Sequence, residues 1–202
     1  MRLHWTGYKW SLKTKDNKRY SAKTIIMTPP VPQALELIHN SQIGFPNEVL
    51  SSLSAISYEP CIALLLKGEI SESRTKSAFI RPKGGLISLI VNNHVKGVSN
   101  EPGAVTIHTS RDFSEQCWDN TEDRLVKAIL DDCREHVQYS GGYLRIHRWR
   151  YSRTINLHPE RCLISDTPGI IAFAGDGFSV RDIEGAAMSG IGAAEEIISR
   201  IK

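Results

Sequence analysis

Gly175 and Asp176 are the residues of this sequence whose types and position are best suited to chemistry. They follow an apolar run, Ile170 to Ala174, that predicts a short buried strand. Because Gly175 has no Cβ, the backbone can turn tightly there or a ligand can approach it closely. Asp176 would then hold a carboxylate just past the carboxyl end of a strand, where open α/β sheets bind ligands. A carboxylate only accepts hydrogen bonds, so this position suits a ligand with hydroxyl donors.

The segment from Glu184 to Ile201 predicts a helix after this turn, with Asp182 as its N-cap. Its first turn would offer free N–H groups and the positive end of the helix dipole to an anionic or electron-rich ligand. Glycine inside a helix costs up to about 1 kcal/mol relative to alanine, so Gly190 and Gly192 indicate that another group packs very closely. A plainer interpretation stays open at this point, in which the helix packs on a sheet and Asp176 is only a turn residue. Small residues recur every four positions in two rows, Gly185, Ser189 and Ala193, and Ala186, Gly190 and Ala194.

The elements that must position this segment are mostly strands. A β-hairpin that turns at Asp16 and Asn17 is predicted first, and a strand over residues 24–28 then ends at a proline cluster. The whole pattern predicts an α+β fold, in which a mainly antiparallel sheet with helices is closed by a strand–turn–helix unit. Further strands are predicted over residues 61–67, 79–80, 86–91, 104–110, 144–149 and 170–174, helices after Pro32, over residues 48–56 and from Thr121, and a break at Gly141 and Gly142.

The charge balance does not favour a nucleic-acid partner. The net charge is +3 and the isoelectric point is about 8.7, and most basic residues are scattered along the chain. Lys13, Lys15, Lys18 and Arg19 do gather around the predicted turn at residues 16–17. We interpret them as the solvated side chains of a hairpin tip.

The cysteines and apolar runs exclude several other classes of protein. Cys61, Cys117, Cys133 and Cys162 stand far apart without a CxxC pair, which argues against a zinc site and against a disulfide scaffold. The longest aliphatic run, Ile62 to Leu66, is far shorter than the roughly 20 residues that span a bilayer. The amino terminus has no run that resembles a signal peptide. We therefore expect no metal, no membrane association and a cytoplasmic location.

Several stretches of the chain, taken in order, resemble the amine-oxidase-like flavoproteins, and most of all the renalase-like FAD-dependent oxidoreductases. The most specific is the closing motif, in which Gly175–Phe178 is followed by Glu184–Ala186 and then by Ser189 and Gly190. The resemblance covers nearly the whole chain. The other stretches are Met27–Gln33, Ser57–Tyr58 with Ala63–Leu64, Ile90–Asn93, Ile107–Thr109 and Arg148–Ser152.

The resemblance implies a site for FAD. In that family, the Asp of the closing motif bonds a ribityl hydroxyl or the pyrophosphate region of the flavin, which gives this role to Asp176. The backbone N–H groups of Glu184 and Gly185 would face the pyrimidine edge of the isoalloxazine and stabilise the negative charge of reduced flavin. Pro30 and Val31 would line the ring through their backbone. The implied cofactor-binding residues are therefore Pro30, Val31, Gly175, Asp176, Glu184 and Gly185.

On the substrate side, we expect Asn93 and Trp149 to act on a small molecule. An amide could orient a nicotinamide-like or amine substrate, and an indole could form an apolar wall. Each has a plainer alternative, since Trp149 on an alternating strand can be a core residue and Asn93 can belong to a turn. His108 and His147 lie in predicted strands, and we expect both to be structural.

The implied reaction is hydride transfer from a reduced dinucleotide isomer or an amine to FAD and then to O2, with release of hydrogen peroxide. Because the flavin carries the hard chemistry, this reaction needs no Ser-His-Asp or Cys-His constellation, and the sequence has none that is obvious. The alternative function is a non-catalytic binding or assembly subunit that keeps the fold without FAD.

The sequence departs from that family at its beginning. Full-length relatives open with a strand, a GxGxxG turn and a helix that holds the ADP pyrophosphate, and this chain has no such segment. We expect three parts: residues 1–28 as a partial FAD-domain hairpin and strand, 29–150 as the substrate-binding domain, and 151–202 as the closing FAD-domain strand and helix. A truncated chain, a split enzyme and a decayed gene would each explain the missing segment. The expected partner is a Rossmann-containing N-terminal polypeptide or a second copy, and the chain alone should not retain FAD tightly.

Overall fold

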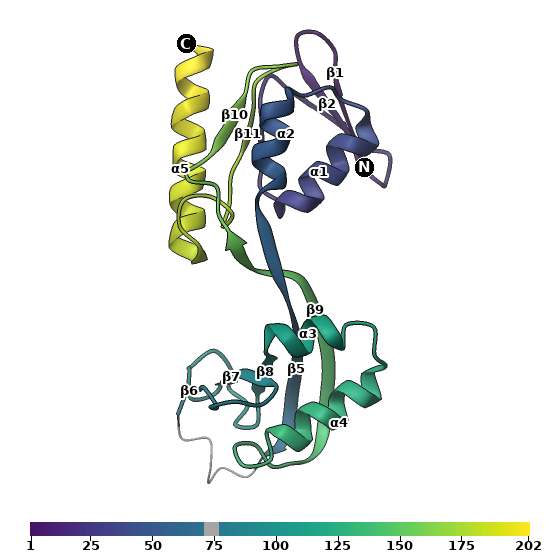
Figure 1. The fold of residues 1–202 in the computed structure, drawn as a ribbon, viewed down its shortest axis with the longest axis vertical. Helices are drawn as coiled ribbons and strands as arrows, with labels where there is room; N and C mark the ends of the chain where they lie inside the picture. Colours follow the sequence, from purple (N-terminus) through teal and green to yellow (C-terminus); the bar gives the residue numbers. More distant parts are fainter. Residues whose placement is uncertain (71–76) are drawn as a thin grey trace. The chain divides into compact units, whose positions relative to one another are not determined.

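The computed structural model describes residues 1–70 and 77–202 and divides into two compact units (Figure 1). The first unit consists of Met1–Tyr58 and Arg153–Lys202, and the second unit of Glu59–Ser152. The chain passes from one unit to the other inside two long strands, β5 (Ser57–Ile70) and β9 (Tyr139–Asn156). Each unit has its own hydrophobic core and is described by itself.

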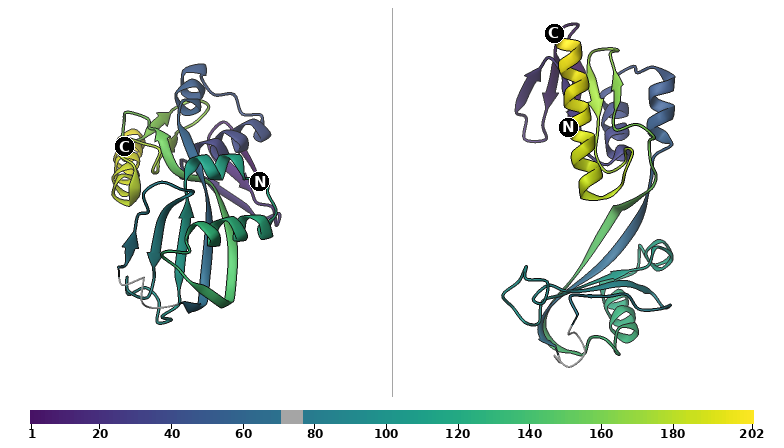
Figure 2. Two further views of the ribbon diagram at one scale, coloured as in Figure 1. Left: turned by 60° about the horizontal axis from the view of Figure 1, so that its bottom comes forward. Right: turned by 90° about the vertical axis from the view of Figure 1, so that its left-hand side faces the viewer.

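The first unit contains two small sheets and the helix that closes the chain (Figure 2). Three antiparallel strands form a meander, β1 (Arg2–Trp5), β2 (Trp10–Lys13) and β3 (Arg19–Ala22). The second sheet has the order β10 (Leu163–Ser165), β11 (Ile171–Phe173), β4 (Ile25–Met27), and its strands β11 and β4 run parallel. The helices of this unit are α1 (Val31–Ser41), α2 (Asn47–Ser54) and α5 (Asp182–Ile201).

The sheet of β10, β11 and β4 is covered by different elements on its two faces, because alternate residues of a strand point to opposite sides. Ile171 and Phe173 pack into the main core with side chains of the meander, α1 and α2. Ala172 points the other way and packs with Ala193 and Ile197 of α5. The small residues of α5 therefore let this helix lie close to the sheet.

The second unit is built on an antiparallel sheet with the order β6 (Phe79–Ile80), β7 (Ile87–Asn92), β8 (Val105–Thr109), β5, β9. Its helices are α3 (Arg111–Gln116) and α4 (Glu122–Asp132). Ile62, Leu64 and Ile107 of the sheet pack with Leu125 and Ile129 of α4 in one core. The predicted α+β class with a mainly antiparallel sheet is confirmed.

Several predicted boundaries differ from the structure. Gly141 and Gly142 do not break the chain but lie inside β9, where the backbone of β5 comes so close at Gly68 that a Cβ would not fit. Asp182 is the first residue of α5 with a φ of 83°, and Arg181 is the N-cap. The strands β1 and β10 and the helix α3 were not predicted, because three to six residues are too few for a periodic pattern to stand out.

The expected division at residue 28 also differs from the structure. Residues 29–58 belong to the first unit, because Val31, Ala34 and Leu37 of α1 pack into the same core as Phe173. The second expected division, between residues 150 and 151, lies close to the observed one between Ser152 and Arg153.

Candidate functional site

Asp176 lies where the two parallel strands of the first unit end. β4 and β11 both finish at this edge of the sheet, and the N–H of Ala174 donates to the carbonyl of Met27 at 3.0 Å. Gly175 follows with a φ of 141°, a conformation that favours glycine. Its N–H donates to Ser189 Oγ of α5 at 2.9 Å. The turn after β11 is thus fixed to both β4 and the closing helix.

The carboxylate of Asp176 is half-buried, and no ion pair or hydrogen bond joins it to another side chain of residues 1–70 and 77–202. Burial raises the pKa of this carboxyl, and the negative charge of Asp182 raises it further. Its backbone is held in place, because the Thr154 hydroxyl donates to the Asp176 carbonyl at 3.0 Å. The side chain is therefore a positioned hydrogen-bond acceptor that a ligand with hydroxyl donors would stabilise.

Tyr58 supports the loop that follows β4. Its hydroxyl accepts the backbone N–H of Val31 at 3.4 Å, and a Cβ on Gly177 would lie 2.8 Å from the same oxygen. Burial raises the pKa of the Tyr58 phenol, so the hydroxyl is neutral.

The two residues predicted after β4 have different surroundings. Val31 begins α1 and is buried in the main core, so only its backbone can face a ligand. Pro30 is half-buried and precedes the helix as its N-cap. Pro30 lies in the loop that leaves the carboxyl end of β4, and Val31 directly follows this loop, next to the edge that holds Asp176.

The two residues predicted at the start of α5 line a small pocket of about 240 Å³. Glu184 is exposed, whereas Gly185 is buried. A Cβ on Gly185 would lie 1.7 Å from the carbonyl oxygen of Val180, so packing inside the chain already requires glycine there. The pocket is smaller than the roughly 300–1,000 Å³ of typical small-molecule sites. Its lining residues are Arg161, Ser179, Val180, Glu184, Gly185, Met188 and Ser189.

Asn93 and Trp149 lie in the second unit, and the structure does not bring them together. The N–H of Asn93 donates to the carbonyl oxygen of Ala104 at 2.9 Å. The neighbouring Gly103 lies close to Gly68 of β5, and Gly68 lies close to Gly141 of β9. Asn93 is therefore at the end of the sheet where β9 begins. Trp149 is eight residues beyond Gly141 on β9. At about 3.3 Å per residue, the two predicted substrate residues are roughly 20 Å or more apart along the strands.

The local contacts of these two residues also differ. Asn93 follows the last residue of β7, and its amide donates to Thr106 Oγ1 at 3.0 Å, as a residue that fixes a turn would. Trp149 is 52% exposed, and its ring lies 4.2 Å from that of His147. Trp149 is thus not a core residue of this unit.

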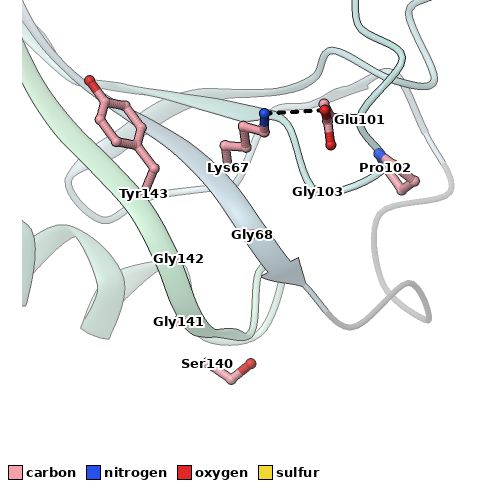
Figure 3. A pocket seen from close by; sticks show the side chains of 9 residues that line it. All are labelled: Lys67, Gly68, Glu101, Pro102, Gly103, Ser140, Gly141, Gly142 and Tyr143. Atoms are coloured by element: carbon pink, nitrogen blue, oxygen red, sulfur yellow. Dashed lines mark ion pairs between the residues drawn. The ribbon is translucent and has the colours of Figure 1, made fainter.

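The second unit has a larger cavity, of about 970 Å³, where β5 ends and β9 begins (Figure 3). None of the predicted site residues lines this cavity. Lys67 and Glu101 form an ion pair at its wall, 3.1 Å apart. Gly103 in the turn before β8 allows close contact with β5, because a Cβ on Gly103 would lie 1.8 Å from the carbonyl oxygen of Gly68.

Cys61 and His108 bring a thiol near an imidazole in the second unit, with Sγ 3.7 Å from Nδ1. Burial raises the pKa of the Cys61 thiol and lowers that of His108, so both groups are neutral and the pair is not an activated nucleophile. Over residues 1–70 and 77–202, no three potential ligands come together as a metal site would need. In the same residues, no helix is long and apolar enough to cross a membrane.

Comparison with solved structures identifies the fold. A protein named as a protoporphyrinogen oxidase of Exiguobacterium sp. 255-15 superposes on 98% of this chain with a TM-score of 0.70 and 12% identity. Putrescine oxidase bound to putrescine superposes on 98% with a TM-score of 0.65 and 13% identity. The chain has the fold of about half of each oxidase. It spans 46% of the first and 47% of the second. No protein-family model matches the sequence, and no curated protein sequence matches it significantly.

The side chains at the edge of β4 and β11 fit part of a flavin nucleotide. An unpaired, half-buried carboxylate at the carboxyl ends of parallel strands suits the hydroxyl groups of a ribityl chain. The chain as described has no strand followed by GxGxxG and a helix, which is the element that binds pyrophosphate. The side chains at this edge could therefore contact the ribityl portion of such a group.

Three residues of this edge were not predicted as site residues. Ser189 holds Gly175, Thr154 holds Asp176, and Tyr58 holds Val31. Only Ser189 had a usable signal, as a polar residue in a row of small residues on a buried helix face. Thr154 and Tyr58 are brought to the edge by the long strands β9 and β5, whose paths sequence alone does not give.

Proposed function

We propose that this chain is the closing part of an FAD-dependent oxidoreductase of the amine-oxidase type. The observation that carries the proposal is the unpaired carboxylate of Asp176 at the carboxyl ends of β4 and β11, in a fold shared with half of such oxidases. When bound in the complete enzyme, FAD would supply the redox chemistry by which a hydride leaves a reduced dinucleotide isomer or an amine and the electrons pass to O2. The resemblance to renalase-like proteins favours this substrate range.

In this proposal, residues of the chain hold one side of the cofactor. Asp176 accepts hydrogen bonds from ribityl hydroxyls, and Gly175 lets the cofactor approach the backbone. Glu184 and Gly185 offer N–H groups at the positive end of α5 to the pyrimidine edge of the ring. Pro30 lines the ring through its backbone, as does Val31. On the substrate side, Trp149 forms a wall, and we assign Asn93 to the turn that its hydrogen bond to Thr106 fixes.

The rest of the FAD site comes, we propose, from a polypeptide with a Rossmann strand and helix. The first argument is the free edge of β4, which lies at the end of its sheet in the described chain. Parallel sheets are normally continued and covered on both faces. Ile26 of β4 is on the face that α5 covers, since it pairs with Ala172, yet it is 41% exposed. A parallel strand on β4 followed by a helix over Ile26 would complete this sheet.

The second argument is an uncovered apolar stripe along α5. The helix buries one face on the sheet, and a second apolar row follows its whole length on the side away from those buried residues. Ile183 in this row is 90% exposed, and Ile191 and Ile198 are about half exposed. A helix docked over Ile26 would lie beside α5 and cover this stripe. The stripe consists of Ile183, Ala187, Gly190, Ile191, Ala194, Ile198 and Ile201.

Reconstitution tests the proposal. The chain is purified alone and together with a co-expressed upstream polypeptide that contains a strand–GxGxxG–helix segment, and bound flavin is measured by absorbance and mass spectrometry. We expect stoichiometric FAD in the complex and little in the chain alone. Asp176→Ala should weaken FAD binding by about 10- to 100-fold, the effect of losing a hydrogen bond to a charged group. Asp119→Ala, which removes an exposed carboxylate of the second unit, is the matched control and should change nothing.

Two outcomes would contradict the proposal in different ways. If the complex forms and Asp176→Ala retains FAD as well as the parent, Asp176 does not hold the cofactor. If the complex forms and never binds flavin, the chain is the non-catalytic binding or assembly subunit. A purified chain that is yellow and holds one FAD by itself would show that no partner is needed.

A further inference from the structure

The meander of β1, β2 and β3 concentrates positive charge. Residues 1–23 hold seven of the 25 Lys and Arg residues of the chain and one of its 22 acidic residues. The pairing register places Arg2 opposite Lys13, and Lys13 opposite Arg19. Directly paired residues of neighbouring strands point to the same face, so these three side chains form one row across the sheet. We call them the cationic row.

No carboxylate within the described part of the chain neutralises the cationic row. Its three side chains are exposed and make no ion pair there. Asp16, the acidic residue of the meander, is engaged with Lys18 at 3.0 Å. Like charges directly opposite each other on neighbouring strands destabilise a sheet. The row therefore lowers the stability of the meander, and an anionic group bound beside it would remove this penalty.

The cationic row ends at a free sheet edge. The sheet order is β1, β2, β3, and every residue of β3 is exposed. The outer backbone groups of an edge strand can pair with an extended segment of another chain. Arg19 belongs both to the row and to this edge, so a strand added to β3 would place one of its side chains directly beside Arg19.

We propose that β3 is a docking edge for an extended acidic segment of a partner protein. The segment adds as a fourth strand, with Asp or Glu beside Arg19 and an apolar residue beside Tyr20. Tyr20 is 58% exposed and points to the opposite face from Arg19, next to Leu12. Specificity then comes from alternation of acidic and apolar residues, because successive side chains of a strand point to opposite faces.

Charge and composition select this partner over others. A second copy of β3 is repelled, because its own Arg19 and Lys18 would meet like charges. The face that carries the cationic row continues with His4, Ser11 and Ser21, which pair with one another across the strands. The residues named on this face include no Phe, Tyr or Trp on which nucleic-acid bases would stack and no apolar side chains to enter a membrane. Backbone pairing at the edge is also open only to a polypeptide.

The test uses the full 202-residue chain and a fluorescein-labelled peptide of about eight residues that alternates glutamate with valine. Binding is followed by fluorescence anisotropy at low and physiological salt. A second peptide of the same sequence carries N-methyl groups on alternate amides along one edge, which removes backbone donors without changing charge. The row variant is Arg2→Ser, Lys13→Ser and Arg19→Ser together. The matched control removes the same charges from exposed residues of the second unit, Arg81→Ser, Arg124→Ser and Lys127→Ser.

We expect the parent and the control to bind the unmodified peptide equally. The row variant should bind it about two- to fivefold more weakly, because it loses the one cross-strand charge pair at Arg19. The N-methylated peptide should bind at least as weakly to the parent. Equal binding of both peptides would overturn strand addition, and equal loss in the control would mean that net charge alone attracts the peptide. Tighter binding to duplex DNA or to vesicles containing phosphatidylserine would replace the acidic segment by a phosphate-bearing partner. None of these results depends on flavin, so they are independent of the proposed oxidoreductase function.

Discussion

Two glycines of α5 make a matched pair for a test of the packing at the start of the helix. Gly185 and Gly190 lie on the same helix, five residues apart, and both have φ in the helical range. A Cβ at Gly185 would lie 1.7 Å from the carbonyl oxygen of Val180, whereas a Cβ at Gly190 would meet nothing within 4 Å. Alanine at the two positions therefore has the same effect on helix propensity and opposite consequences for packing.

The magnitudes follow from these two terms. Gly→Ala in a helix interior stabilises by up to about 1 kcal/mol. At Gly190 nothing opposes this gain, so we expect Gly190→Ala to raise the free energy of unfolding by about 0.5–1 kcal/mol. At Gly185 the overlap is with backbone, so the loop of Val180 or the helix must move, at a cost of about 1–3 kcal/mol or more. We expect Gly185→Ala to be destabilising by about 1–2 kcal/mol net, and the two variants to differ by about 2 kcal/mol.

Urea unfolding of the first unit measures this difference. A background of Trp118→Phe and Trp149→Phe leaves Trp5 and Trp10, whose rings lie 5.1 Å apart in the first unit, as the fluorescent reporters. The midpoint should shift down for Gly185→Ala and up for Gly190→Ala, with an unchanged slope. If Gly185→Ala is as stable as Gly190→Ala, the close contact with Val180 does not exist and the geometry of the site at the start of α5 is incorrect.

Three further changes test the same unit. Ser189→Ala removes the acceptor of the Gly175 N–H and should cost about 1–3 kcal/mol in urea unfolding, whereas Ser199→Ala on the exposed side of α5 should stay within about 0.5 kcal/mol. The raised pKa of Asp176 means that the folded chain holds this proton to higher pH than the unfolded chain, so the carboxylate lowers stability as pH rises above the usual carboxyl range. Asp176→Asn should therefore raise the Tm at pH 7 and leave it unchanged at pH 3; an equal gain at both would rule out the charge as its cause. Ile198→Lys should leave the stability of the isolated chain unchanged but weaken pull-down of the Rossmann polypeptide, and its neighbour Ser199→Lys should do neither; equal pull-down by both variants would place the partner elsewhere.

The closing strand, turn and helix could be predicted from sequence because each leaves a local signal. The run before Gly175 is apolar and short, and the helix after it has a strong periodicity of small residues. The strands in the middle of the chain were predicted for the same reason, from apolar runs and from alternation in Leu144 to Trp149. These features depend on neighbours within a few residues.

The organisation into units could not be predicted, because it depends on contacts between distant parts of the chain. Residues 29–58 look like the beginning of a new domain, since a proline cluster separates them from β4. In the structure they return to the core of Phe173, more than a hundred residues away. The distance between Asn93 and Trp149 could not be predicted for the same reason, since strand order and register place them at different ends of one sheet.

The glycines of α5 have two different explanations, which the sequence alone does not separate. Sequence alone indicated that something packs very closely on this helix, and it did not separate the positions. Gly185 is accounted for by Val180, and Gly192 by Arg161, whose Cβ would lie 3.2 Å from an added Cβ. Gly190 has no such neighbour in the described chain and lies in the uncovered stripe, where glycine lowers helix stability without any compensating contact. A glycine that weakens its own helix although a Cβ would have room there is explained if a partner helix crosses α5 at that point. Gly190→Ala should then stabilise the isolated chain and weaken its association with the Rossmann polypeptide, two effects of opposite sign that a purely structural role for Gly190 does not produce.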